Sequence, residues 1–172
     1  VTHSDEMTIF EMGGMASDGI RAIAESGDAS VAMSALSGNS AVHDVMASNS
    51  PIGPGGMLSM ELEGREGEDV LSVAVMLVCT NDGFTGVQSI ELPDDADQDV
   101  HEAVAYDAGT EMNEETSETI VDGCGLGDDG NARTATSEPI GRHDGIQGTA
   151  DLDPDMHGWT DPVARITVQR ME

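Results

Sequence analysis

The sequence predicts one mainly β domain with one or two short helices near its N-terminal end. Apolar and polar residues alternate strictly over residues 58–63 and again over 164–169, which is typical of half-buried strands. Residues 70–79 are apolar on both faces, as expected for a strand in the middle of a sheet. A chain of 172 residues is long enough for one domain and short for two, so residues 1–172 are predicted to form a single domain.

Two short helices are predicted ahead of the first long strand. Ser17 can cap a helix that ends at Gly27, and the residues between them carry an apolar stripe at i, i+3 and i+4. Ser30 can cap a second helix that ends at Gly38 in the same way. Because both stripes are short, we expect these helices to pack on a sheet rather than to form a bundle.

The other elements follow in order along the chain. The Pro- and Gly-rich turn at residues 51–56 precedes the strand 58–63, which we expect to pair with 70–79 as a hairpin. Further strands are predicted at residues 84–92, 100–106 and 164–169. Residues 113–161 are rich in Gly, Asp, Thr and Pro, which predicts mostly loop, and a loop of that length usually carries function.

The core is predicted from an unusual composition. Aromatic residues make up only 2% of the chain, so Val, Ile, Leu, Ala and the eleven methionines are expected to fill the interior. We expect Trp159, the only tryptophan, to anchor the loop before the last strand by packing.

The charge of the chain is extreme. Six arginines and no lysine stand against 34 acidic residues, which gives a formal charge of -28. The acids are interleaved with strand-like segments instead of forming one block, so we expect a folded domain with an acidic surface. Such a surface is tolerated where salt is molar, because the Debye length then falls to about 3 Å. The composition therefore predicts a protein of an extreme halophile.

The same composition argues against several partners. Binding nucleic acid requires clustered cations to neutralise phosphates, and the six arginines are scattered. No apolar run approaches the ~20 residues of a membrane-spanning helix, and no signal segment opens the chain.

Cys79 and Cys124 are the only cysteines, and two readings stay open. They can form one disulfide, which would indicate an extracellular setting, or remain as two buried free thiols. Two thiols without a matching histidine spacing do not predict a zinc site.

Three acidic residues stand at turns that end strands. Asp82 follows the apolar run 70–79, while Asp107 and Glu111 belong to the segment Tyr106-Asp-Ala-Gly-Thr-Glu111. Carboxylate oxygens are the hard donors that Ca²⁺ prefers, so these three can form a calcium site. However, with 34 acids in 172 residues a cluster is also expected by chance. A carbohydrate-active hydrolase with paired acids is a further alternative, since sequence does not give side-chain separations.

A series of segments in this order resembles the N-terminal domain of F-spondin and its prokaryotic, haloarchaeal-type relatives. The segments are residues 71–82, Phe84, Gly86, 106–111 and 159–168, and upstream of them 14–28 and 53–56. The likeness covers nearly the whole chain. It depends on the order of the segments, because each of them alone is a weak motif.

The resemblance implies an antiparallel β-sandwich in a secreted or cell-surface protein that is adhesive and not an enzyme. It implies one Ca²⁺, with Asp82, Asp107 and Glu111 at the positions of the family's ligands. The expected partners are cell-surface or matrix components. Gly83 stands where the family commonly has an aromatic residue, so we expect a looser loop there.

The family usually begins with a β-strand that is not found ahead of Val1. A sheet edge left without its strand invites a strand from another molecule. The alternative function is therefore a structural subunit of a filament or other assembly, in which copies of the chain join through a strand edge.

Overall fold

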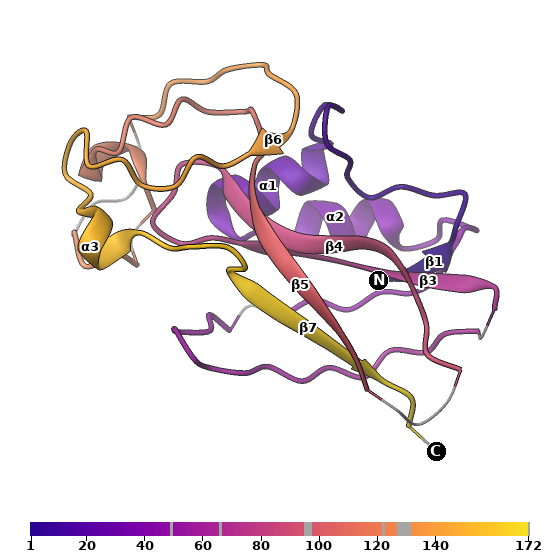
Figure 1. The fold of residues 1–172 in the computed structure, drawn as a ribbon. Coiled ribbons are helices and arrows are strands. Elements are labelled where there is room, and N and C mark those ends of the chain that lie inside the picture. Colours follow the sequence, from indigo (N-terminus) through magenta and orange to yellow (C-terminus); the bar gives the residue numbers. More distant parts are fainter. Residues whose placement is uncertain (49, 66, 95–97, 122, 127–131, 172) are drawn as a thin grey trace.

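The computed structural model describes residues 1–48, 50–65, 67–94, 98–121, 123–126 and 132–171 (Figure 1). In chain order the elements are β1 (Thr2–Ser4), α1 (Asp18–Ser26), α2 (Ser30–Leu36), β2 (Val42–Asp44), β3 (Asp69–Met76), β4 (Gly83–Glu91), β5 (Gln98–Asp107), the 3-10 turn η1 (Ser117–Thr119), β6 (Gly141–Arg142), α3 (Pro154–His157) and β7 (Ala164–Gln169).

The strands form an open antiparallel sheet. Its order is β2-β1-β3-β4-β5-β6, and β7 pairs with β5 away from this path. The long strand β5 is shared, because its last residues pair with β4 whereas its first six pair with β7. In Figure 1, β7 runs beside β5 while β4 diverges from it. The predicted mainly β fold is thus confirmed, and a closed two-sheet sandwich remains a prediction.

Both predicted helices are present, and the sequence explains the ends of α1. The Ser17 side chain accepts a hydrogen bond from Ile20 N, and Gly27 ends α1 in the left-handed region at φ 68°. Helix α2 also forms, but its N-cap is Ala29 rather than Ser30, and it ends at Leu36 with Ser37 as the C-cap rather than at Gly38. Helix α1 packs on β3 and β4 and buries Ile20 and Ala24 there.

Three aromatic rings form the centre of the main core. Phe10 lies 5.1 Å from Phe84 and 5.3 Å from Tyr106, measured between ring centroids. Phe84 is fully buried, and the rings pack with Ile20, Ala24, Ala108 and Ile140. The expected Val, Ile, Leu and Ala are in the core, but the expectation for methionine is wrong: no buried apolar residue of the described chain is a methionine. Phenylalanine and tyrosine are few, but all three rings are gathered in one place, where they pack against each other.

A second apolar cluster lies under the long loop region. Ile120, Ile146 and Leu152 are buried in it, and Trp159 packs against them. The Trp159 ring also meets the His143 ring edge to face at 5.1 Å, so Trp159 anchors the loop before β7 as expected. Residues 113–161 are mostly irregular, as predicted, although residues 122 and 127–131 lie outside the described part.

The predicted strand at residues 58–63 is wrong. These residues form no strand, and β3 pairs with β1 and β4 and makes no hairpin with them. Alternation was the only signal for that strand, and it does not say whether a partner strand is within reach. Strand β3 also ends at Met76, three residues before Cys79.

Strands β1, β2 and β6 were missed because each has only two or three residues. Strand β1 is secured to β3 by a buried histidine. His3 is fully buried, its Nδ1–H donates to Ser4 O at 2.8 Å, and its Nε2 accepts from Ser72 Oγ at 2.7 Å. Strand β1 thereby lies beside β3 along Asp69–Leu71.

Candidate metal centre

The candidate site lies where the turn between β3 and β4 meets the end of β5. The hydrogen bond from Leu77 N to Gly83 O at 2.9 Å closes the turn. Gly83 pairs with Asp107, and Asp82 O accepts from Ala108 N at 3.1 Å. The two segments that carry the predicted ligands are therefore held side by side by their backbones.

Glycine at position 83 has a packing reason. A Cβ on Gly83 would lie 2.5 Å from Thr80 Oγ1, and this hydroxyl accepts from Gly83 N at 2.9 Å and donates to Leu77 O at 2.6 Å. The Thr80 side chain thus occupies the space that a larger residue would need. Gly83 is buried in a closely hydrogen-bonded turn, which does not support the expectation of a looser loop.

Asp82 is fully buried and holds the start of the following loop. Its Oδ2 accepts hydrogen bonds from Thr110 N at 2.6 Å, Thr110 Oγ1 at 3.1 Å and Glu111 N at 3.0 Å. Its other oxygen, Oδ1, is buried and has no hydrogen-bond partner among the described residues. One half of the carboxylate is therefore structural, and the other half remains available to a ligand.

Asp107 and Glu111 flank a tight loop. Asp107 Oδ1 accepts from Gly109 N at 2.7 Å, and its Oδ2 accepts from Asn113 Nδ2. Gly109 has φ +71°, and a Cβ there would lie 2.2 Å from Glu138 O, so only glycine fits. Glu111 is 7% exposed and pairs with Arg133 through Oε1 and Nη1 at 3.2 Å.

The site concentrates negative charge in a buried place. Burial raises the pKa of Asp82, and the neighbouring Asp107 charge adds to this, while the hydrogen bonds from Thr110 and Glu111 oppose it. Burial also raises the pKa of Glu111 to about 7, although Arg133 opposes that shift. Two carboxyls that resist ionisation are what a cation would stabilise in their charged form.

The carboxylate oxygens of the site supply some, but not all, of the ligands that a hard cation needs. Glu111 Oε2, like Asp82 Oδ1, is buried and accepts no hydrogen bond from the described residues. However, no three His, Cys, Asp or Glu side chains of the described part gather into a group that holds a metal by itself. The Asp82 carboxylate contacts the backbone of Glu111, and Asp107 is near enough to act on the pKa of Asp82.

A disulfide stands beside the site. Cys79 and Cys124 are bonded, with their Cα atoms 5.4 Å apart. Cys79 precedes Asp82 by three residues in the same turn, and both cysteines pack against the Ile120, Ile146 and Leu152 cluster. The bond therefore ties the turn that carries Asp82 to the long loop region.

Glu115 organises the long loop and was missed in the sequence. It is 5% exposed, and its carboxylate accepts from Gln147 N, Thr149 N at 2.7 Å and Thr149 Oγ1 at 2.9 Å. Burial acts to raise the pKa of Glu115, but the hydrogen bonds from Gln147, Thr149 and Gly148 outweigh it and hold the pKa below its usual range. Its partners lie about thirty residues away, so no local sequence signal identifies this glutamate among so many acids.

Comparison with known proteins adds one positive finding. The model of the family described as Spondin_N matches residues 1–119, a range that contains β1 to β5, both helices before β3 and all three predicted ligands. A search of curated proteins finds no match. In the described residues, no helix has the length and apolar content needed to cross a bilayer.

Proposed function

Because this chain belongs to the spondin N-terminal domain family, a family of non-enzymatic, extracellular-type modules, we propose that it is an extracellular calcium-binding module. It would act in cell-surface adhesion or matrix contact in an extreme halophile. The observation that carries the calcium proposal is the pair of buried, unpartnered oxygens, Asp82 Oδ1 and Glu111 Oε2. The disulfide agrees with an oxidising, extracellular setting.

The proposed ligands suit calcium more than other common metals. Ca²⁺ takes six to eight oxygens at about 2.3–2.6 Å and accepts backbone carbonyls and water beside carboxylates. Asp82 and Glu111 would bind through their unpartnered oxygens, and Asp107 would complete the acidic set. Carbonyl oxygens and water are needed for the rest, since the described side chains do not form a complete site alone.

The ion would have a structural role. Asp82 belongs to the β3–β4 turn and Glu111 to the loop after β5, so a shared cation joins these two segments. It would also offset the burial of Asp82 and the repulsion from Asp107, which together raise the pKa of Asp82. The end of the sheet would then be rigid enough to present its loops to a partner.

Chelation tests this role. A ligand at 100 times its Kd stabilises the folded state by about 2.7 kcal/mol, which corresponds to a shift of roughly 5–10 °C in the melting temperature of a domain of this size. We expect EDTA to lower the melting temperature in molar NaCl by that amount, and Asp107→Asn to reduce the effect. Asp155→Asn, in the exposed part of α3, is the matched control. A melting curve that EDTA leaves unchanged contradicts the proposal.

Arg133 is expected to oppose calcium. Its guanidinium already neutralises Glu111 at 3.2 Å, and its side chain is only 17% exposed, so its charge is poorly screened. We expect Arg133→Gln to tighten calcium binding about tenfold, which equals about 1.4 kcal/mol. Arg142→Gln removes the ion pair with Asp161 instead and should leave the affinity unchanged. Calorimetric titration with Ca²⁺ measures the affinity of the unmodified protein and of both variants. If Arg133→Gln binds calcium no more tightly than the unmodified protein, this role of Arg133 is refuted.

A further inference from the structure

The segment Met57–Glu63 has the pattern of a strand but no strand partner. Among the described residues, the backbone groups of residues 57–62 form no hydrogen bond. Only the end of the segment is held, since Glu63 N donates to Asp44 Oδ2 at 2.9 Å and Glu63 O accepts from Thr2 Oγ1 at 2.6 Å. Its amide and carbonyl groups are free to pair with another strand.

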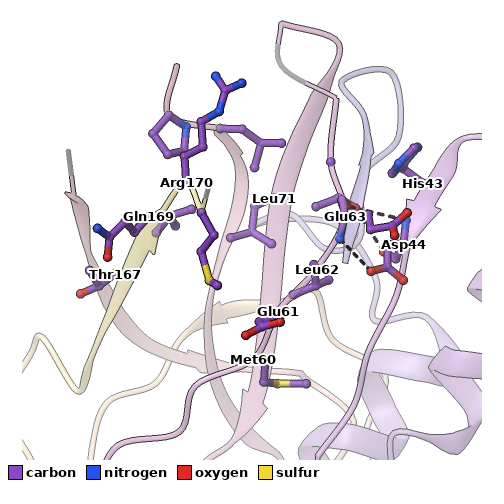
Figure 2. A pocket seen from close by; sticks show the side chains of 16 residues that line it. His43, Asp44, Met60, Glu61, Leu62, Glu63, Leu71, Thr167, Gln169 and Arg170 are labelled. Atoms are coloured by element: carbon purple, nitrogen blue, oxygen red, sulfur yellow. Dashed lines mark hydrogen bonds between the residues drawn. The ribbon is translucent and has the colours of Figure 1, made fainter. Parts of the chain in front are cut away.

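The segment also exposes much apolar surface for so acidic a chain. The side chains of Met57, Leu58 and Met60 are 87%, 43% and 38% exposed. The segment borders a groove of about 1100 Å³, with Leu71 and Leu92 among the residues in its wall. Figure 2 shows Met60, Glu61 and Leu62 on one side of this groove and Leu71 near its centre. Unpaired backbone groups beside exposed apolar side chains are typical of an interaction surface.

The sequence of the segment, Met-Leu-Ser-Met-Glu-Leu-Glu, is complementary to itself. In an antiparallel pair centred on Met60, each Met60 faces its own copy and Leu58 faces Leu62 of the partner, so one face is entirely apolar. On the other face Glu61 is opposite Ser59. No glutamate faces a glutamate directly in this register.

Strand pairs in the neighbouring registers are expected to be less stable. Centring the pair on Glu61 places the two Glu61 side chains opposite each other, and centring it on Leu62 places Glu61 opposite Glu63 twice. Like charges directly opposite destabilise a strand pair, and the chain has few cations to offset them. A register centred on Ser59 loses residues to the Gly- and Pro-rich turn at 53–56.

We propose that residues 57–63 form an antiparallel strand pair with the same residues of a second copy, about a two-fold axis at Met60. Such an isologous contact closes on itself and yields a dimer. It brings the two Met60 side chains together and gives hydrogen-bond partners to the backbone groups of alternate residues in both segments. The contact uses a different segment from the candidate calcium site, so either can exist without the other.

Cysteine cross-linking tests both the contact and its register. Cys79 and Cys124 are bonded to each other, so an introduced cysteine is the only free thiol in the described chain. In the proposed register the two Met60 Cα atoms lie about 4.5–5.5 Å apart, within the range for a disulfide. We expect Met60→Cys to form a covalent dimer under mild oxidation in molar salt, where repulsion between the acidic chains is screened.

Met57→Cys is the matched control, because position 57 is more exposed than position 60. The two introduced cysteines would lie roughly 20 Å apart in this register, since six residues of strand separate them. They should therefore cross-link far less than the Met60→Cys pair. Equal cross-linking of both variants, or none at Met60→Cys, overturns the proposal.

Sedimentation equilibrium in molar salt gives an independent readout. We expect the unmodified protein to show twice the mass of one chain and Met60→Glu to show the mass of one chain, with an unchanged melting curve at low concentration. Met156→Glu changes an exposed methionine on α3 and should leave the dimer intact. A monomeric unmodified protein at high concentration, or a Met60→Glu dimer, refutes the contact.

Discussion

Replacing both Cys79 and Cys124 by serine is expected to lower the free energy of unfolding by about 4 kcal/mol. The bond closes a loop over a sequence separation of 45, and the chain-entropy relation assigns about this value to such a loop. For a domain of this size the melting temperature should fall by roughly 8–16 °C. Chemical denaturation in constant salt, with the linear extrapolation, measures the loss.

Two further measurements decide whether the missing disulfide causes this loss of stability. Reduction of the unmodified protein should reproduce the loss, and the double serine variant should then be insensitive to reductant. If the variant loses less than about 1 kcal/mol, or if reductant leaves the unmodified protein unchanged, the disulfide does not restrain the chain as described.

Replacing Glu115 by glutamine is expected to cost roughly 3 kcal/mol. The buried carboxylate accepts from Gln147 N, Thr149 N and Thr149 Oγ1, and an amide has only one oxygen to offer to these three donors. The loop that carries Ile146 and Leu152 should lose its anchor. Glu118→Gln changes an exposed neighbour and should cost little. Equal stabilities of the two variants would contradict this role of Glu115.

The same glutamate predicts a pH dependence. Its pKa is lower in the folded protein than the ordinary value of 4.5, so its contribution is complete above that value and is lost as the pH falls through the folded pKa. Below pH 4.5, therefore, the stability of the unmodified protein should approach that of Glu115→Gln. A difference between the two that stays constant down to low pH would show that the charge of Glu115 is not responsible.

The elements that could be predicted are those whose signal is local. Ser17 and Gly27 mark the ends of α1, and the alternation at residues 164–169 marks β7. Strands β1 and β2 could not be predicted, because three residues carry no period and β1 depends on His3 meeting Ser72 from across the chain. The alternation at residues 58–63 predicted a strand that the single chain does not pair.

The candidate site was predictable to a similar extent. The order of segments in the sequence placed Asp82, Asp107 and Glu111 together, and the structure brings Asp82 into contact with the Glu111 backbone. Arg133 and Glu115 were not predictable. Each acts on partners more than twenty residues away, and in a chain with 34 acids a single glutamate carries no signal of its own.

The metal content of the protein tests the calcium proposal most directly. We expect elemental analysis of protein purified and dialysed in molar NaCl to find one calcium per chain, and Asp82→Asn to contain none while remaining folded. Asp155→Asn should retain the ion. Calcium absent from the unmodified protein even after incubation with excess Ca²⁺, or retained in full by Asp82→Asn, would contradict a calcium site built on Asp82 and Glu111.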